Sequence, residues 1–277
     1  MLHASSEPAY QPRKWNSMNQ VMATHNCYSY MLNDLYYSPR KNHKPQPGHH
    51  YIRRTKSIKY KGIENINCDH TVEGVLKDNP HIKVLSIKEG KTKKIPKHYY
   101  KGILVVSPNN DYHFARCDNR LLKIYSEIIA QRLENISDRK LVSIILHLCK
   151  RFLHKDIMEK IPTNISQKQQ LKLLYKYSKT WSHKPGSSSV TDRDADGKII
   201  FDPVKANWNF ESQGGQNYSV VCCFFHVPAN KFKPTYSSGV SLSPFNSLQK
   251  RNMRSNIYIH DKEALLDIRV QKIIKTI

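Results

Sequence analysis

The sequence places one cysteine where a thiol could act as a nucleophile. Asn26 is a predicted helix N-cap, because apolar side chains follow it at helical spacing: Tyr28, Met31, Leu32 and Leu35. The helix should end before Ser38-Pro39, since the residue before a proline disfavours helical backbone. Cys27 then lies in the first turn, where unpaired N–H groups favour a thiolate and its own N–H can donate to an oxyanion. Cys27 is therefore the candidate nucleophile, with Asn26 as the helix cap beside the oxyanion site.

A cysteine nucleophile needs a base within hydrogen-bond reach and a polar group that orients this base. His113 lies in a strand expected over residues 112–116, where alternation directs it away from its aromatic neighbours. His183 is the best candidate for the orienting group, and Asn109 or Asp111, in the turn before the strand, are alternatives. Spacing alone is weak support, because the chain has 14 histidines and 6 cysteines, and a helical cysteine is usually a small apolar core residue.

Several short motifs occur in an order that resembles a known group of proteins. They are Asn26-Cys27-Tyr28-Ser29-Tyr30, Lys44-Pro45-Gln46-Pro47-Gly48, Asp111-Tyr112-His113-Phe114-Ala115-Arg116, Trp181-Ser182-His183-Lys184-Pro185-Gly186, Asp194-x-x-Gly197 and Ile200-Phe201-Asp202-Pro203. The series resembles uncharacterised papain-like proteins of bacteria, phages and large DNA viruses that are similar to NlpC-type cysteine hydrolases. The resemblance covers residues 15–118 and 180–228, and its motifs are specific in combination rather than singly.

The resemblance implies an α+β fold in which an N-terminal helix bearing the cysteine packs on an antiparallel sheet. Cys27, His113 and His183 match the nucleophile, the base on the first following core strand, and the polar residue on the neighbouring strand. In the relatives a short hairpin joins these two strands, whereas roughly sixty residues of helical pattern separate them here, and hairpin tips tolerate such insertions.

Composition and periodicity predict the organisation of the chain. The regions are an N-terminal surface arm (1–18), a discontinuous papain-like core (19–119 and 180–228), a basic insertion of three helices (120–179), and a C-terminal loop and helix (229–277). Asp261 is expected to cap the last helix. The core patterns predict an extended basic loop over 41–54, a helix over 69–79, and strands over 82–87, 102–106, 112–116, 198–201 and 218–227.

The function that these residues predict is a thiol-dependent hydrolase or acyltransferase. His113 would take the proton of Cys27, and the sulfur would attack the carbonyl of a peptide-like or acylated substrate without a cofactor. The alternative is a catalytically inactive papain-like scaffold that serves as a basic virion-associated or sequence-independent nucleic-acid-binding protein, because folds are often kept after catalysis is lost.

The charge balance supports an anionic partner. The chain has 45 Lys+Arg against 22 Asp+Glu, a formal net charge of +23. Basic residues gather in the segments 40–61 and 88–101 and in the insertion, where tyrosines lie among them. Such a surface suits nucleic acid or another anionic surface in a salt-sensitive way, although a merely solvated basic face explains it equally well.

The remaining signals concern compartment and metals. The N-terminus lacks a charged start followed by an apolar run, and no segment is long enough to span a bilayer. The cysteines form no C-x-x-C, which favours reduced thiols in the cytoplasm of a host cell or in a virion. No structural-zinc spacing occurs. Asp192, Asp194 and Asp196 form a weak calcium-loop pattern, in which Pro203 stands where the glutamate of the twelfth position would be. The alternative interpretation of these residues is a plain acidic turn.

Overall fold

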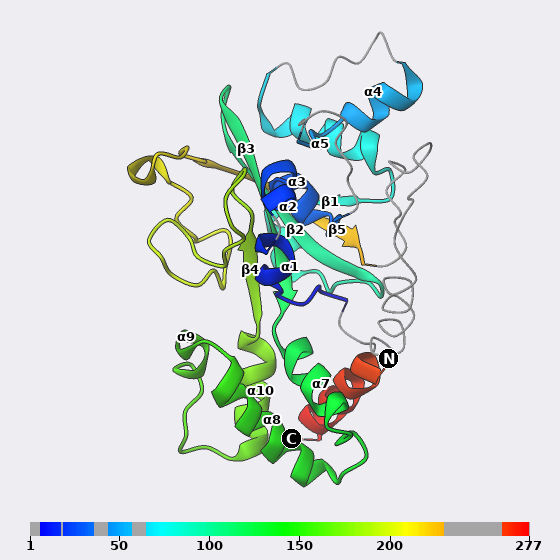
Figure 1. The fold of residues 1–277 in the computed structure, drawn as a ribbon, viewed down its shortest axis with the longest axis vertical. Coiled ribbons are helices and arrows are strands. Elements are labelled where there is room, and N and C mark those ends of the chain that lie inside the picture. Colours follow the sequence, from blue (N-terminus) through cyan, green and yellow to red (C-terminus); the bar gives the residue numbers. More distant parts are fainter. Residues whose placement is uncertain (1–5, 18, 36–43, 57–64, 230–261, 277) are drawn as a thin grey trace. The chain divides into compact units, whose positions relative to one another are not determined.

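A computed structural model describes residues 6–17, 19–35, 44–56, 65–229 and 262–276, and the chain divides into two compact units (Figure 1). We call the part formed by residues 6–118 and 180–229 the sheet unit. We call the part formed by residues 119–179 and 262–276 the helical unit. The expected α+β class is confirmed, since one unit is built on a sheet and the other contains only helices between its loops.

The sheet has five strands in the order β1-β5-β2-β3-β4. Their bounds are β1 Lys83–Leu85, β2 Tyr99–Ser107, β3 Asp111–Asn119, β4 Lys179–His183 and β5 Val220–Pro228. The pairs β1–β5, β2–β5 and β2–β3 are antiparallel. Asn109 closes the β2–β3 hairpin at φ 60°, a left-handed conformation that asparagine tolerates better than most residues.

Two predicted strands are shorter than expected. Residues 198–201 form only isolated bridges, in which Ile199 pairs with Arg193 and Ile200 with Trp181. Pro203 follows closely and has no N–H with which to extend a ladder. The strand expected over 82–87 ends at Leu85, because Ser86 caps the helix α6 (Ile87–Thr92) with a capping box.

The sheet unit contains more helix than the sequence patterns indicated. Its other helices are α1 Pro12–Asn16, α2 Asn19–Thr24, α3 Cys27–Met31, α4 His49–Thr55, α5 Cys68–Asp78 and the 3₁₀ turn Glu211–Gln213. Within the predicted surface arm, α1 buries one residue: Trp15 is buried, and its ring meets the Tyr30 ring edge-on at 4.8 Å. The prediction of an extended loop over 41–54 is wrong from His49 onward, where Gly48 opens α4 at φ 84°.

Helix α3 is shorter than expected for a local reason. It begins with a capping box in which Asn26 accepts from the Ser29 N–H, and the Ser29 side chain accepts from the Asn26 N–H. It ends in a Schellman motif, in which Asn33 N–H donates to Tyr30 O at 3.0 Å and Asp34 N–H donates to Ser29 O at 2.9 Å. Asn33 adopts φ 54°, so the helix stops after five residues.

Apolar side chains cover both faces of the sheet. On one face Tyr28 and Met31 of α3 pack among residues of β2, β3 and β5. On the other face α6 lies so close to β5 that a Cβ on Gly90 would come within 2.0 Å of the Phe224 ring. The same face carries Trp181 and Trp208.

The helical unit has a core of its own. Four helices lie between β3 and β4 where three were predicted: α7 Leu121–Ala130, α8 Asp138–Phe152, α9 Lys155–Met158 and α10 Gln167–Tyr177. The additional α9 is a single turn that His154 caps through its ring nitrogen. A helix over residues 262–275 contributes Leu266, Val270 and Ile273 to the same core. Most of the predicted C-terminal loop, and the predicted cap Asp261, lie outside the described residues.

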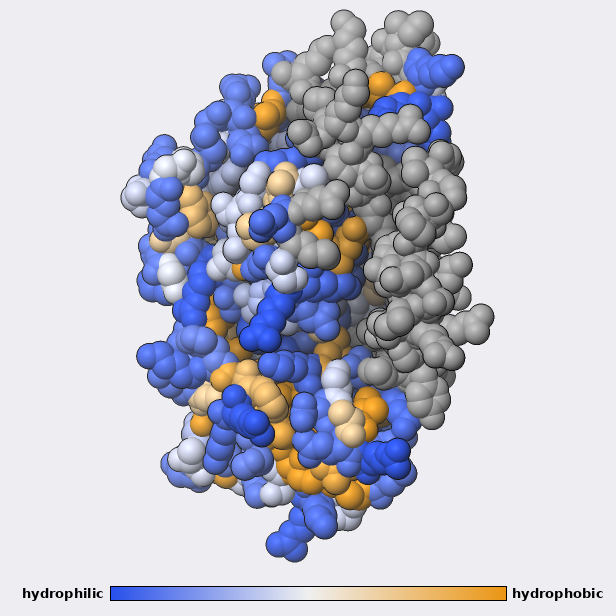
Figure 2. All heavy atoms as spheres, viewed as in Figure 1, coloured by the Kyte–Doolittle hydropathy of each residue, from blue (hydrophilic) through white to orange (hydrophobic). Residues whose placement is uncertain are grey.

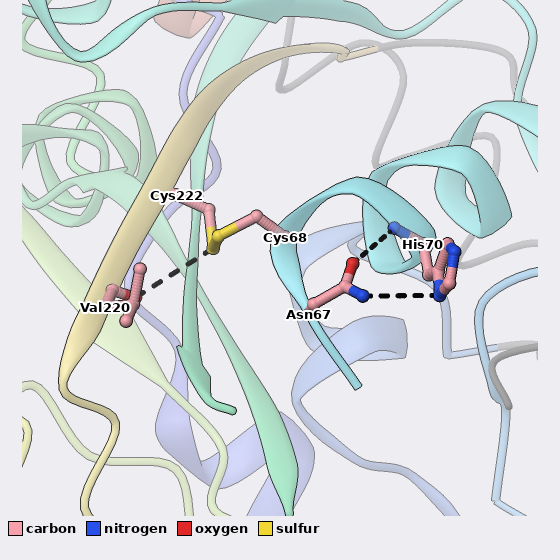
Figure 3. The surroundings of a disulfide bond; sticks show 5 residues. All are labelled: Asn67, Cys68, His70, Val220 and Cys222. Carbon is pink, nitrogen blue, oxygen red and sulfur yellow. Dashed lines mark hydrogen bonds between the residues drawn. A yellow bond between two sulfur atoms is a disulfide. The ribbon is translucent and has the colours of Figure 1, made fainter. Parts of the chain in front are cut away.

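One disulfide corrects the expectation that all cysteines are reduced. Cys68, the first residue of α5, is bonded to Cys222 of β5, 154 residues further along the chain (Figure 3). Asn67, which precedes Cys68, caps α5 by accepting from the His70 N–H at 2.9 Å (Figure 3). The four remaining cysteines are buried and are not part of a disulfide: Cys27, Cys117, Cys149 and Cys223.

Candidate functional site

Cys27 lies at the start of α3, against the backbone of β3. Its thiol donates to Tyr112 O at a sulfur–oxygen distance of 3.9 Å. The Cys27 side chain belongs to the core cluster on the α3 face of the sheet, together with the rings of Tyr112 and Phe114. The thiol therefore contacts the main chain on the N-terminal side of His113, and the Phe114 N–H on the other side acts on the sulfur electrostatically.

His113 and His183 are brought together across 70 residues of sequence. The nitrogen Nε2 of His113 lies 2.7 Å from Nδ1 of His183. The nitrogen Nε2 of His183 in turn lies 2.8 Å from Arg193 O. Both rings are buried, and the ring of Tyr218 stacks on His113 at 5.1 Å between centroids. The two histidines and the Arg193 carbonyl thus form one continuous hydrogen-bonded chain.

This series of hydrogen bonds determines which ring nitrogens of His113 and His183 carry protons. A carbonyl oxygen can only accept, so His183 Nε2 must donate to Arg193 O. In the neutral ring His183 Nδ1 is then an acceptor, and His113 Nε2 must donate to it. Neutral His113 is left with its lone pair on Nδ1. Nδ1 is bonded to the ring carbon that carries Cβ, so it lies nearer the β3 backbone than Nε2 does.

The thiol and the His113 ring approach β3 from opposite faces. His113 faces the side of the sheet that carries Trp208 and Tyr218, as alternation along a strand requires, whereas Cys27 lies on the α3 side. No hydrogen bond joins the two side chains, both of which belong to the described residues; the thiol donates to Tyr112 O instead. Strand β4, which neighbours β3 in the sheet, ends at His183.

Burial controls the protonation of all three groups. It raises the pKa of the Cys27 thiol to about 12, an effect that the Phe114 N–H opposes and the Asp111 carboxylate reinforces. Burial also lowers the pKa of His113 well below its usual value, and the neighbouring His183 adds to this. Burial lowers the pKa of His183 to about 4. At neutral pH the site is therefore a neutral thiol with neutral imidazoles.

A buried polar network fixes the elements that carry these residues. Arg116, three residues after His113, donates through Nη1 to Tyr30 O of α3 and through Nε to Asp118 Oδ1, each at 2.9 Å. Its guanidinium also lies 3.9 Å from the centre of the Tyr30 ring. The Tyr30 hydroxyl is 2.6 Å from Ser182 Oγ, and Ser182 donates to Asp118. The network thus links α3, β3 and β4 close to Cys27, His113 and His183.

The alternative orienting residues have other roles in the structure. Asn109 shapes the hairpin turn, and its N–H donates to Ile66 O at 2.7 Å. Asp111 accepts from the Tyr112 N–H and from the Tyr218 hydroxyl, both at 2.8 Å. Among the described residues, neither of these two side chains forms a hydrogen bond with the His113 ring, whereas His183 does.

The predicted calcium loop is an acidic turn in the structure. Asp194 accepts from the N–H groups of Asp196 and Lys198 through Oδ1, and from the Asn207 N–H through Oδ2. Asp196 accepts from the side chains of Asn207 and Lys198. Asp192 lies 3.8 Å from the Arg193 guanidinium. Within the described residues no group of three His, Cys, Asp or Glu is arranged to hold a metal ion.

Sequence reasoning did not identify Arg116, Tyr218 or Lys184 as part of the site. Arg116 and Lys184 were visible inside the quoted motifs, but a charged residue in a basic chain gives no signal of burial. Tyr218 is one of 16 tyrosines and lies more than a hundred residues from His113. Only the tertiary structure places these side chains around the thiol and the two imidazoles.

None of the helices in the described part of the chain could span a membrane. Comparison with protein-family models, with curated proteins and with solved structures gives no match. The resemblance to NlpC-type proteins therefore remains a prediction from the motifs.

Proposed function

We propose that the sheet unit is a papain-like, NlpC-type domain with a helical insertion, and that it acts as a thiol-dependent hydrolase or acyltransferase on amide or peptide-like bonds. The hydrogen-bonded chain from Arg193 O through His183 to His113 carries the proposal. It leaves a basic nitrogen, Nδ1 of His113, on the ring edge nearest to the strand backbone that the Cys27 thiol contacts.

In the proposed mechanism substrate binding moves the Cys27 sulfur from Tyr112 O around the edge of β3 to His113 Nδ1, because the two side chains start on opposite faces of this strand. His113 takes the thiol proton as the sulfur attacks the carbonyl carbon, so a free thiolate is not needed. The Cys27 N–H at the start of α3 donates to the oxyanion. His113 then protonates the leaving group, and water or another acceptor releases the acyl group from sulfur. His183 holds the His113 tautomer throughout.

Thiol reactivity tests this proposal without a known substrate. Cys27, Cys117 and Cys223 have nearly equal exposed fractions of 5%, 6% and 7%, so burial alone predicts similar alkylation by iodoacetamide. General-base assistance predicts that Cys27 reacts about 10²-fold faster than the other two. Replacing His113 by alanine should remove this advantage, which peptide mass spectrometry of the labelled native protein measures.

A matched control is His226→Ala, because His226 is also a buried histidine on a strand of the sheet unit but belongs to β5. This variant should keep the faster labelling of Cys27. Equal labelling of the three cysteines in the wild-type protein, or equal effects of the two histidine variants, would refute the proposed role of His113.

A second function, sequence-independent binding of single-stranded nucleic acid, is favoured by one observation in the helical unit. Helix α10 contains no acidic residue, and its exposed lysines recur every four residues: Lys168, Lys172 and Lys176. This spacing places successive charges about 6 Å apart along one face. Lys179 lies over the Tyr175 ring and Lys176 over the Tyr177 ring, at 5.4 and 5.0 Å, so aromatic rings lie among the cations of this segment, a combination typical of single-strand binding.

Anisotropy of a short labelled oligothymidylate tests this second function. Replacing the three α10 lysines by glutamine should weaken binding and reduce the slope of log affinity against log salt by about 2, since each phosphate contact contributes about 0.7. Three exposed lysines of the sheet unit serve as a control triple when replaced by glutamine: Lys94, Lys97 and Lys205. Equal losses in the two triple variants would show diffuse charge attraction rather than a binding face on α10.

A further inference from the structure

Two lysines lie on the side of the site where β4 ends. Lys184 directly follows His183 and is fully buried. Its Nζ donates to Met22 O at 2.9 Å, to Gly186 O at 2.7 Å and to Ser188 O at 3.1 Å. These three acceptors use all three of its protons, so Lys184 holds the loop after β4 against α2 and cannot reach a ligand.

Lys44 approaches the same place from another segment. Pro45, its neighbour, accepts from Asn26 Nδ2 at 2.7 Å, and Asn26 is the cap beside Cys27. Further along the segment, Gly48 N–H donates to Asp78 Oδ2 at 2.8 Å. Residues 44–48 are thus fastened at both ends across the start of α3. The Lys44 backbone therefore lies one residue from a direct contact with the helix cap.

The Lys44 ammonium points to the loop that follows His183. A Cβ built on Gly186 would lie 3.8 Å from Lys44 Nζ, which places the charge between residues 44–48 and that loop. Lys44 and the Cys27 sulfur both act electrostatically on the Lys184 ammonium. Among the described residues no carboxylate forms an ion pair with Lys44. A partly exposed cation therefore lies beside Lys184, whose own ammonium interacts with the Cys27 sulfur.

The other charges near the thiol do not cancel this one. Asp111 is the carboxylate that acts on Cys27, and it already accepts from the Tyr218 hydroxyl and the Tyr112 N–H. Burial lowers the pKa of Lys184 to about 8, so this lysine remains largely protonated at neutral pH. His113 and His183 are neutral there. The Lys184 and Lys44 ammonium groups therefore lie together on the side of the site where β4 ends, and Asp111 is the carboxylate that acts on the thiol itself.

We propose that the substrate carries an anionic group, a carboxylate or a phosphate, close to the carbonyl that Cys27 attacks, and that Lys44 binds this group. The inference rests on the proposed function of Cys27 and specifies the substrate class of the same site. Lys184 contributes a fixed positive charge in the loop after β4, and Lys44 is the specificity-determining residue. Arginine at position 44 would retain the charge, whereas glutamine would remove it with little change in length.

Paired alkylating reagents test the inference. Iodoacetate and iodoacetamide have similar size and chemistry, but only iodoacetate is anionic. The rate with iodoacetate divided by the rate with iodoacetamide is measured at Cys27 and at Cys223. The Cys27 ratio divided by the Cys223 ratio reports the local charge beside Cys27. An ammonium group several ångströms from the reagent predicts that Lys44→Gln lowers this normalised ratio about fivefold at low salt, and that added salt diminishes the difference.

Lys88→Gln is the matched control, because Lys88 is an exposed lysine of the same unit on α6. It should leave the ratio unchanged, and Lys44→Arg should preserve most of the wild-type ratio. If Lys44→Gln changes the normalised ratio no more than Lys88→Gln does, the inference is overturned. If Cys27 reacts with neither reagent faster than Cys223 does, the proposed function itself fails. Protection of Cys27 by acetate or by inorganic phosphate separates the two anions.

Discussion

Replacing Arg116 by methionine tests how far the buried network holds the candidate site together. Arg116 and Asp118 have exposed fractions of 1% and 0%, so methionine would leave the carboxylate buried without its countercharge. Two further acceptors of the guanidinium, Tyr30 O and Asn33 Oδ1, would also lose their donor. Breaking one side of a buried ion pair costs about 3–5 kcal/mol, so we expect the free energy of unfolding of the sheet unit to fall by this amount.

Urea denaturation followed by tryptophan fluorescence measures this change in one unit alone. All three tryptophans, Trp15, Trp181 and Trp208, belong to the sheet unit. With a denaturant slope of about 2 kcal/mol per molar, the loss moves the urea midpoint down by about 2 M. Urea is preferable to guanidinium because it does not screen the charges under test.

Two further variants separate loss of the ion pair from loss of packing. Arg116→Met combined with Asp118→Asn removes the uncompensated charge and should recover part of the stability. Tyr30→Phe removes only the hydroxyl, which bonds to Ser182 and donates to Asp118, and should cost about 1 kcal/mol. The exposed Arg53→Met is the control. A shift for Arg116→Met as small as that of the control would refute the buried ion pair.

Three more predictions follow from the same structure. The pKa of His183 is about 4 in the folded protein and about 6.5 in the unfolded chain, so the unfolded chain binds more protons between these two pH values. The free energy of unfolding should therefore fall by up to about 3 kcal/mol as the pH drops from 6.5 toward 4. His183→Gln should reduce this pH dependence, which urea denaturation at a series of pH values measures. Alkylation of the urea-denatured protein should modify four thiols without reductant and six with it, and six in both would exclude the bond between Cys68 and Cys222. Gly90→Ala should lower thermal stability by about 1–3 kcal/mol, because the new methyl meets the aromatic ring that β5 places against α6; an unchanged melting temperature would contradict this packing.

Local signals in the sequence were sufficient where neighbouring residues determine the structure. The side chains of Asn26 and Ser29 can satisfy the first N–H groups of a helix without help from distant residues, so the start of α3 was predictable. The hairpin around Asn109 was predictable for the same reason. The end of α3 was not, because apolar spacing continued to Leu35 while Asn33 turned the chain and bonded to Arg116, which lies more than eighty residues away.

Charged and basic segments were the hardest to interpret from the sequence. Lysines and arginines are usually solvated, and nothing in their spacing shows that Arg116 and Lys184 are buried or that residues 49–55 form a helix. The disulfide gave no local signal either, because Cys68 and Cys222 are far apart in the chain.

The sequence by itself determined the α+β class, the cap before Cys27, and the strand face on which His113 lies. It also nominated His183, but only as one alternative among three. The tertiary structure decided the arrangement of that residue, because a hydrogen bond of 2.7 Å between rings 70 residues apart depends on how β3 and β4 lie in the sheet. The proton positions in the chain from Arg193 O to His113 depend on a carbonyl that can only accept. That information exists only once the chain is folded.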